Sequence, residues 1–178
     1  MFSPTPITGL QIFTPRVFGD ERGYFFESWN ERTFAEAGIN TKFVQDNQAR
    51  SPQGVLRGMH FQTGEQAQSK LVRVIEGEVF DVAVDMRPES PTLHQWFGIR
   101  LSEENQKQMY VPRGFAHGYL VLSETAVFAY KCDNFYANHA EGGLRYDDPA
   151  IGIEWPEVEA KLVVAERDLT WDLLVGSK

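Results

Sequence analysis

The sequence predicts an all-β fold, a sandwich or a barrel of short strands with a few short helices, and three observations support this. Between residues 42 and 133, short segments rich in β-branched and aromatic residues follow one another at nearly regular spacing, with turn residues between them. Apolar and polar residues alternate clearly over residues 70–74 and 79–84, as in strands with one buried face. Strands that do not alternate with helices are typical of sandwiches and barrels, not of layered α/β sheets.

The N-terminal part of the chain is predicted to hold short edge strands. Apolar and polar residues alternate over residues 7–18, and Pro15 in the middle of this stretch breaks it with a turn. Residues 20–23 have the composition of a turn, and the aromatic-rich residues 24–29 are typical of a further strand.

A single helix is expected directly after these strands. Asn30 can cap a helix over residues 31–37, and Gly38 can end it. The strands that follow are expected over residues 42–50, 55–62, 70–75, 79–86, 95–101, 108–111, 118–122 and 126–133. Glu76 and Gly77 form a tight turn between the two alternating segments, which predicts that these segments pair as a hairpin.

The last part of the chain, from Gly142 onward, is rich in turn residues. A short apolar run over residues 162–165 leads to Glu166, Arg167 and Asp168. No repeat, linker or low-complexity segment divides the chain, so one domain over residues 1–178 is expected.

The composition excludes several classes of partner. The chain has 25 acidic and 17 basic side chains and a net charge of −8. Nonspecific binding to nucleic acids or anionic membranes depends on cationic surface, so neither partner is expected, whereas a local cluster of arginines would still bind a small anion.

The cysteine content and the hydropathy indicate the compartment. Cys132 is the single cysteine, which excludes an intrachain disulfide and a cysteine-rich zinc site and fits a reducing compartment. The sequence has no run of about 18 apolar residues that would span a membrane, and residues 1–10 lack the features of a signal peptide. We therefore expect a cytoplasmic protein.

The most informative polar residue is His60, which stands between Arg57 and Lys70. A histidine between two cations suits a general base that lies beside groups for binding an anion. From this stretch alone, a structural histidine that forms a hydrogen bond in the core is the alternative interpretation.

Two fragments resemble the metal-binding motifs of the cupin superfamily, whose members are small jelly-roll barrels. Residues 112–117, PRGFAH, match the Pro-x-Gly-x-x-His pattern of the second motif. In the first motif, residues 60–62 are His-Phe-Gln instead of His-x-His, and Lys70 takes the place of the acidic ligand. A lysine ammonium cannot coordinate a metal ion and repels it, and two histidines alone make a poor site. We therefore expect neither a catalytic metal nor a cofactor.

The same residues suit chemistry without a metal. An enzyme that removes a proton next to a ketone needs a base, a cation or donor for the developing enolate oxygen, and an acid that returns the proton. His60, Lys70 and a tyrosine can supply these groups. A solvated surface lysine is the alternative interpretation of Lys70.

Segments along nearly the whole chain match one family in order. They are DERGYFFE (20–27), FVQDNQ (43–48), VLRGMHFQ (55–62), KLVRV (70–74), VPRGFAHG (111–118), YKCDNFY (130–136) and DDP (147–149). On these residues the chain resembles the dTDP-4-dehydrorhamnose 3,5-epimerase family, metal-free cupins that act on a nucleotide-linked 4-keto-6-deoxy sugar in dTDP-L-rhamnose synthesis. The resemblance implies a cupin-type jelly roll and an isomerase, independent of cofactors, that inverts C3 and C5 of dTDP-4-dehydro-6-deoxy-D-glucose.

The resemblance also implies catalytic roles. His60 is the general base, Asp168 orients it, Tyr130 is the acid on the opposite face of the sugar ring, and Lys70 lies beside the C4 oxygen. These roles agree with simple chemistry, because a carboxylate bonded to one imidazole nitrogen leaves the other nitrogen free to accept a proton. Without the resemblance, Tyr130 is a core aromatic residue and Asp168 an exposed turn residue.

A nucleotide site follows from the same resemblance. Its residues are Arg22, Glu27, Gln45, Asn47, Arg57, His117, Tyr136, Glu141 and Arg167, with Tyr136 stacking on the thymine. Arginine matches phosphate oxygens with a planar fork of donors, and Gln and Asn side chains read a pyrimidine edge. Arg167 stands where the family usually has lysine, and the proline that often follows is absent from residues 169–171.

The resemblance further implies a homodimer, because Arg22 and Glu27 lie on the early strand that family members lend to a partner subunit. Taken alone, Arg22 is an ordinary turn arginine and Glu27 an outward-facing strand residue. Other functions that fit parts of the sequence are an epimerase that inverts a single carbon, a metal-dependent cupin oxygenase and a non-catalytic sugar-binding cupin. A base, an orienting carboxylate, a cation and an acid together favour the enzyme.

Overall fold

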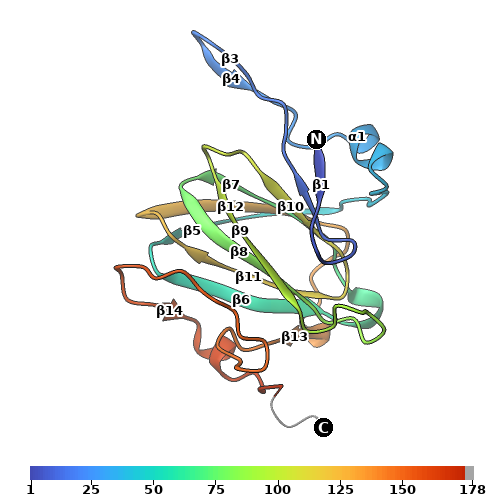
Figure 1. The fold of residues 1–178 in the computed structure, drawn as a ribbon, viewed down its shortest axis with the longest axis vertical. Coiled ribbons are helices and arrows are strands. Elements are labelled where there is room, and N and C mark those ends of the chain that lie inside the picture. The colour runs from blue at the N-terminus through green and yellow to red at the C-terminus, as the bar shows by residue number, and fades with distance from the viewer. Residues whose placement is uncertain (175–178) are drawn as a thin grey trace.

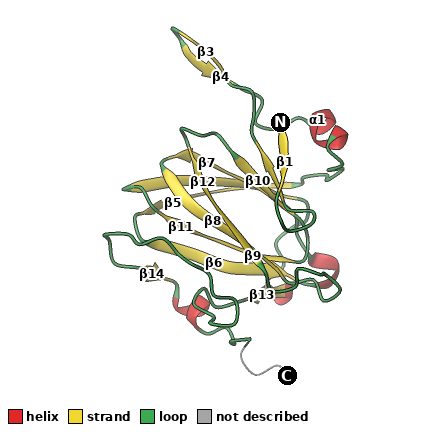
Figure 2. Ribbon diagram, viewed as in Figure 1, coloured by secondary structure: helices red, strands yellow, loops and turns green. Residues whose placement is uncertain are grey.

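The computed structural model describes residues 1–174, which fold mainly into strands (Figure 1; Figure 2). Most strands belong to two sheets that share one core. The first sheet contains, in spatial order, β1 (Phe2–Pro4), β2 (Gln11–Phe13), β10 (Gln108–Val111), β7 (Lys70–Glu76), β12 (Thr125–Cys132) and β5 (Gln45–Pro52). The second contains β13 (Glu141–Gly143), β6 (Val55–Gln62), β11 (Phe115–Val121), β8 (Glu78–Asp85) and β9 (Trp96–Ser102), and β14 (Val163–Val164) pairs with β6 in parallel. This sandwich confirms the predicted all-β, jelly-roll fold class.

The remaining elements are short. They are the hairpin of β3 (Phe18–Asp20) and β4 (Gly23–Phe25), the helix α1 (Glu31–Glu36), and the 3₁₀ turns η1 (Gly64–Gln66), η2 (Asn138–Ala140) and η3 (Glu166–Leu169). Helix α1 begins where the sequence predicted, because the Asn30 side chain accepts hydrogen bonds from the backbone amides of Arg32 and Thr33, at 3.1 and 3.4 Å. The chain leaves α1 through Gly38, whose φ of +82° is the left-handed conformation that ends many helices.

The core lies between the two sheets and follows the alternation of side chains along the strands. Val72 and Val74 of β7 and Phe128 of β12 contribute to it from the first sheet. Ala83 of β8 and Tyr119 of β11 meet them from the second sheet, and the Tyr119 ring stacks on Phe128 with centroids 4.0 Å apart. The inward-facing positions of β7, β12, β6 and β11 therefore surround one interior.

Both outer faces are partly covered by segments that leave the sheets. Helix α1 covers part of the first sheet through Phe34, whose ring lies 4.9 Å from that of Phe13. The C-terminal segment covers the second sheet, where the Trp155 ring meets Phe80 edge-on at 6.0 Å and its Nε1 donates to the Tyr146 carbonyl at 2.8 Å. Each cover buries apolar side chains that would otherwise face water.

The predicted hairpin between residues 70–74 and 79–84 is wrong. Strand β7 pairs with β10 and β12 in the first sheet, whereas β8 pairs with β11 and β9 in the second. Gly77, with a φ of +79°, carries the chain from one sheet to the other. An added Cβ at this position would lie 2.1 Å from the Thr125 carbonyl oxygen, so the turn requires glycine for space as well as for its backbone conformation.

Several predicted strand boundaries also differ from the structure; the strand expected over residues 42–50, for example, is β5 from Gln45 to Pro52. Strand β11 begins at Phe115, before the predicted residue 118, so His117 lies inside the strand. The strand expected over residues 24–29 is only the short β4, whose three residues are all exposed. Aromatic composition alone predicted a longer strand there.

The β3–β4 hairpin extends away from the sandwich in Figure 1. Its side chains Phe18, Tyr24 and Phe25 are 51%, 63% and 67% exposed. Large apolar side chains gathered on a projecting hairpin mark a contact surface in many proteins.

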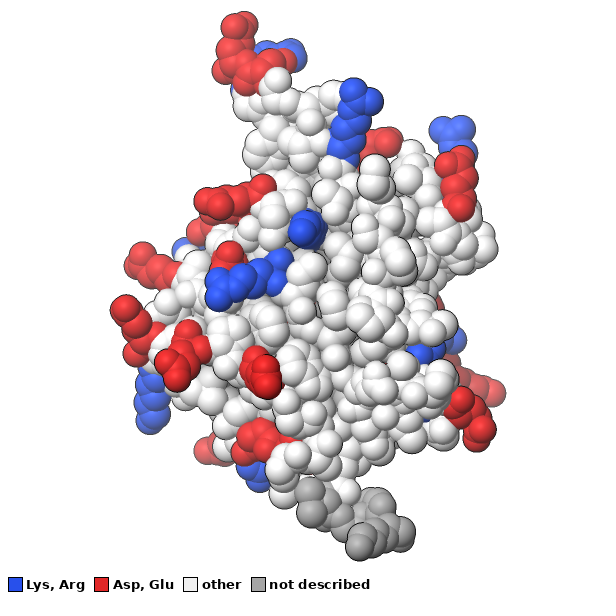
Figure 3. Space-filling model, in the orientation of Figure 1, with Lys and Arg blue, Asp and Glu red and all other residues white. Residues whose placement is uncertain are grey.

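Acidic side chains predominate on the face shown in Figure 3, in keeping with the net charge of −8. Among residues 1–174, no helix has the length and apolar character needed to cross a membrane.

Candidate active site

A β-bulge in β6 turns two of the predicted site residues toward the same side of the sheet. His117 of β11 lies opposite His60 of β6. Tyr119, the next residue on the same face of β11, lies opposite Arg57, so β6 contains one more residue than β11 between these pairs. Gly58, within the bulge, has a φ of +135°, and an added Cβ would lie 2.5 Å from a Cα atom of β11. Only glycine fits this bulge.

A cavity of about 590 Å³ lies between the two sheets, and both Arg57 and His60 line it. The other predicted residues in its wall are Lys70, His117, Tyr130, Arg167 and Asp168. The structure therefore brings together all four predicted catalytic residues, although they come from β6, β7, β12 and η3.

The His60 and Asp168 side chains form a hydrogen-bonded pair at the cavity wall. His60 Nε2 lies 2.7 Å from Asp168 Oδ1, and the side chains are 24% and 3% exposed. Burial raises the pKa of the Asp168 carboxyl, but the hydrogen bond and charge of His60, the Gly58 amide and Arg167 outweigh burial and hold that pKa below its usual value. The ionised carboxylate holds the Nε2 proton, which leaves Nδ1 of the imidazole free to accept a proton.

Lys70 and Tyr130 reach the cavity from the first sheet. Lys70 lies on the same face of β7 as Val72, and Tyr130 lies on the same face of β12 as Phe128, so both side chains point inward. Burial lowers the pKa of the Lys70 ammonium, an effect that the nearby Cys132, Asp81 and Glu141 partly oppose. This is not the solvated surface lysine of the alternative interpretation.

Burial also raises the pKa of the Tyr130 phenol, with a further contribution from Cys132, while Arg57 acts in the opposite direction. The phenol thus keeps its proton at neutral pH and can donate it.

His117 is held by a carboxylate that the sequence reasoning missed. His117 Nε2 lies 2.9 Å from Asp81 Oδ1, and the two residues are 6% and 0% exposed. Burial raises the pKa of Asp81, against the opposing effects of His117 and Lys70. The available signal was a single carboxylate in the apolar strand that runs from Val79 to Val84, because a charged residue in such a strand needs a buried partner.

Tyr119 and Ser51 are further residues near the cavity that were not predicted. Arg57 Nε donates to Ser51 Oγ at 3.1 Å, which fixes the guanidinium on the cavity wall. Burial raises the pKa of Tyr119 to about 12, although Arg57 and Ser51 counteract it. No motif marked these positions, because both read as ordinary strand residues.

A smaller groove of about 200 Å³ adjoins the cavity and shares His60, Lys70, Tyr130 and Arg167 with it. Its other predicted residues are Gln45, Asn47, Tyr136 and Glu141. These polar groups form a chain of hydrogen bonds. Gln45 Nε2 donates to Asn47 Oδ1 at 3.0 Å, the Tyr136 amide donates to Gln45 Oε1 at 3.2 Å, and the Tyr136 hydroxyl donates to Glu141 Oε2 at 3.1 Å. Arg167 Nη1 completes the chain at 3.3 Å from the same Glu141 oxygen.

A family model described as dTDP-4-dehydrorhamnose 3,5-epimerase matches residues 4–175 of the sequence. The chain belongs to this epimerase family. A dTDP-4-dehydrorhamnose 3,5-epimerase from Salmonella typhimurium is 58% identical over 153 residues, which are 85% of this chain and 84% of the relative. Membership of the family makes the protein an isomerase and confirms the resemblance found in the sequence.

Solved structures of similar proteins agree with this assignment. A dTDP-6-deoxy-D-glucose-3,5-epimerase from Legionella pneumophila, in complex with dTDP-4-keto-L-rhamnose, is 47% identical with a TM-score of 0.95, over 100% of this chain and 94% of that one. A 3′-monoepimerase from Streptomyces bikiniensis, in complex with dTDP-quinovose, is 29% identical with a TM-score of 0.89, over 96% of this chain and 86% of that one.

Two residues that the epimerase-family resemblance assigned to the nucleotide site lie elsewhere in this chain. Arg22 sits at the tip of the β3–β4 hairpin, 85% exposed in its side chain, and pairs with Asp20. Glu27 accepts a hydrogen bond from Asn30 Nδ2 at 3.0 Å, near the start of α1. Neither residue lines the cavity or the groove of its own chain.

No group of three or more His, Cys, Asp or Glu side chains with the arrangement of a metal site occurs within residues 1–174. The donor set around the cavity explains this, because Lys70 occupies the place of an acidic ligand and Asp168 is engaged with His60.

Proposed function

We propose that this protein inverts C3 and C5 of dTDP-4-dehydro-6-deoxy-D-glucose to form dTDP-4-dehydro-L-rhamnose, as a step of dTDP-L-rhamnose biosynthesis. The observation that carries this proposal is the His60–Asp168 pair, which faces Lys70 and Tyr130 across one cavity. The identity of 58% to a 3,5-epimerase over most of both chains supports the same substrate.

His60 removes the proton from the carbon next to the C4 ketone. The bond to Asp168 leaves Nδ1 as the accepting atom, and the carboxylate stabilises the imidazolium that forms. The Lys70 ammonium lies near the C4 oxygen and stabilises the negative charge that develops there on the enolate. This charge stabilisation takes the place of a metal ion.

Tyr130 returns a proton to the opposite face of the ring. His60 belongs to the second sheet and Tyr130 to the first, so a sugar bound in the cavity lies between them. Deprotonation from one side and protonation from the other inverts the carbon. Because C3 and C5 both adjoin C4, the same pair of residues serves either centre after the ring has shifted.

The groove beside the cavity suits the nucleotide. Arg167, which lines both the groove and the cavity, and Arg57, which lines the cavity together with His117, provide guanidinium groups for the diphosphate. The amides of Gln45 and Asn47 can pair with the thymine edge, and the exposed Tyr136 ring can stack on its face. A chain with an acidic surface therefore binds an anion through a local cluster of cations.

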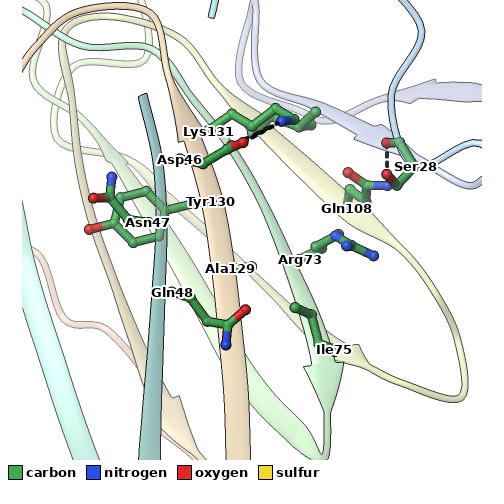
Figure 4. A pocket seen from close by; sticks show the side chains of 11 residues that line it. Ser28, Asp46, Asn47, Gln48, Arg73, Ile75, Gln108, Ala129, Tyr130 and Lys131 are labelled. Atoms are coloured by element: carbon green, nitrogen blue, oxygen red, sulfur yellow. Dashed lines mark hydrogen bonds and ion pairs between the residues drawn. The ribbon is translucent and has the colours of Figure 1, made fainter. Parts of the chain in front are cut away.

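We further propose a homodimer in which the β3–β4 hairpin docks on a partner and delivers Arg22 and Glu27 to the partner's nucleotide site. The exposed Phe18, Tyr24 and Phe25 side chains on the hairpin support it. The part of the first sheet's outer face that α1 leaves uncovered carries a pocket next to Arg73 and Ile75 (Figure 4).

The second candidate function inverts a single carbon, and the similarity to a 3′-monoepimerase at 29% identity is the observation that favours it. Incubation of the protein with the keto-sugar nucleotide in heavy water separates the two. Deuterium at C3 and C5, located by NMR and mass spectrometry, is expected. Deuterium at one carbon only would support the monoepimerase, and none at either carbon would refute both functions.

Matched controls address the remaining classes. His60→Ala should abolish isotope incorporation while substrate binding persists. Binding without exchange in the unmodified protein would indicate a non-catalytic sugar-binding module, and stoichiometric iron or nickel in elemental analysis would indicate a cupin oxygenase. The single, buried cysteine supports a cytoplasmic location for this one-domain enzyme.

A further inference from the structure

Trp171 lies on the backbone of β13 in a contact that no catalytic role explains. The indole stands directly over Gly143, so that a Cβ atom added to Gly143 would lie 2.1 Å from Trp171 Cε2 and 2.2 Å from Nε1. Real side-chain contacts never come so close, so this seat for the ring exists only because position 143 is glycine.

This seat is next to the catalytic pair. Gly143 of β13 lies opposite His60 in the β13–β6 ladder. Trp171 follows closely after η3, the 3₁₀ turn that contains Asp168. The ring therefore ties the C-terminal end of this turn to the strand beside His60.

The other end of the turn is tied to the same region. Strand β14, which precedes η3, pairs in parallel with β6 through Val163 opposite Val55 and Val164 opposite Leu56. Asp168 lies between these two attachments, so the position of its carboxylate depends on both. The turn has no side-chain cap at its N-terminus, and two side-chain contacts support it further: Arg167 Nη1 lies 3.3 Å from Glu141 Oε2, and Arg145 Nη1 donates to the Leu169 carbonyl at 3.4 Å.

The Trp171 ring is held by shape and not by a hydrogen bond. Its Nε1 is buried and has no hydrogen-bond partner within residues 1–174. An unpaired buried donor costs stability, so the packing of the ring on Gly143 must outweigh that cost. Trp155, by contrast, donates its Nε1 to the Tyr146 carbonyl on the outer face of the second sheet.

We propose that Trp171, seated on Gly143, is a positioning residue that holds the Asp168 carboxylate against His60. This inference rests on the proposed function, in which the pair acts as base and orienting group. A displacement of about 1 Å at a catalytic group can reduce the rate by about 100-fold. A ring that fixes the turn is therefore a determinant of kcat, and because Arg167 lies on the same turn, a smaller effect on KM is expected beside it.

The first test is a double-mutant cycle with Asp168→Asn. Trp171→Ala should lower kcat by roughly 10- to 100-fold and change KM by a smaller factor, whereas Trp171→Phe, which keeps an aromatic ring over Gly143, should retain most activity. In the Asp168→Asn background, Trp171→Ala should cause little further loss. If its full effect persists in that background, Trp171 does not act through Asp168 and the inference is overturned.

The second test changes Gly143, the residue on which the Trp171 ring packs. Gly143→Ala should push the ring away and reproduce the kcat defect, and the same change should add nothing to Trp171→Ala, because the clash is then gone. Trp155→Ala removes another tryptophan of the C-terminal segment and controls for general loss of stability. An equal kcat defect in Trp155→Ala would mean that both residues act through stability alone, against the inference.

A measurement that does not depend on turnover separates this inference from the proposed function. The hydrogen-bonded Nε2 proton of His60 should give a downfield NMR signal in the wild type and in Trp171→Phe, and lose it in Trp171→Ala and Asp168→Asn. Absence of isotope exchange in the wild type would refute the proposed function alone. Persistence of the signal in Trp171→Ala would refute the positioning role.

Discussion

His60 and Asp168 are 108 residues apart in the sequence, yet His60 Nε2 lies 2.7 Å from Asp168 Oδ1. The two side chains meet because β14 pairs in parallel with β6, and this pairing places the following turn, η3, next to the strand that carries His60. The proposed base and the group proposed to orient it thus come from distant parts of the sequence. The activity of the enzyme should therefore depend on the C-terminal segment as much as on the cavity.

Substitutions in this pair should differ in their effect. His60→Ala removes the base and should abolish both turnover and isotope exchange. Asp168→Asn keeps the shape but weakens the hold on the Nε2 proton, so kcat should fall by about 10²- to 10⁴-fold while some exchange remains. Steady-state kinetics with deuterium incorporation measures both. Equal residual exchange in the two variants would contradict the assignment of His60 as the base.

Tyr130→Phe should separate proton removal from proton return. The change deletes the phenol that donates the proton but keeps the ring that packs beside Phe128, so the fold should persist. Formation of inverted product should fall by about 10²- to 10⁴-fold. Exchange of the substrate proton with solvent should continue, because His60 still forms the enolate. Product inversion at the wild-type rate would exclude Tyr130 as the acid.

Lys70→Met should decrease activity and increase stability. Burial lowers the pKa of Lys70 in the folded protein, so the unfolded chain binds the proton more strongly. The contribution of Lys70 to the free energy of unfolding therefore rises with pH between the lowered pKa and the ordinary lysine pKa. Below the lowered pKa, the buried ammonium destabilises the folded state by its full desolvation cost. The uncharged methionine side chain removes the penalty, so Tm at neutral pH should rise. In the wild type, kcat should fall on the alkaline side at a lower pH than an ordinary lysine would give. A variant that is both active and less stable would oppose this role.

Local patterns predicted those parts of the fold that depend on local chemistry. The N-cap Asn30 and the terminating Gly38 predicted α1, and the alternation in residues 70–74 predicted the strand that is β7 in the structure. The lysine at the place of a metal ligand directed the chemistry toward an enolate. Each of these inferences needs only neighbouring residues and the period of a strand or helix.

Other features depend on contacts that no local pattern contains. Strict alternation would place Arg57 and His60 on opposite faces of β6, and only the bulge against β11 turns both inward. The turn at Gly77 has the composition of a hairpin turn. Pairing of β7 with β10 and β12, and of β8 with β11 and β9, nevertheless places the two strands in different sheets. The packing of Trp171 on Gly143 likewise joins two residues that no sequence motif marks.

Gly58→Ala should be more damaging than its size suggests. A Cβ at this position would lie 2.5 Å from the Gly118 Cα and 3.0 Å from the His117 carbonyl oxygen, and the φ of +135° disfavours any side chain. The bulge should therefore shift, with loss of most activity and a lower Tm. Gly23→Ala is a matched control, because its φ is +117° but no atom lies within 4 Å of the added Cβ. Equal effects of both changes on Tm would show that backbone strain and not close approach decides the outcome.

Mixing two defective variants should reveal whether Arg22 acts in the partner's site. In a dimer with exchanged hairpins, a complex of Arg22→Ala and His60→Ala subunits has one site with neither defect, because that site takes His60 from the first subunit and Arg22 from the second. Random reassociation makes half of the dimers mixed, so activity should recover to about a quarter of the wild-type value. Arg57→Ala mixed with His60→Ala should not recover, since both residues line the cavity of a single chain. Arg22 at the tip of a hairpin that carries exposed Tyr24 and Phe25 is suited to such a crossing. Mixtures that stay inactive, in a sample shown by light scattering to be dimeric, would place Arg22 outside the partner's site.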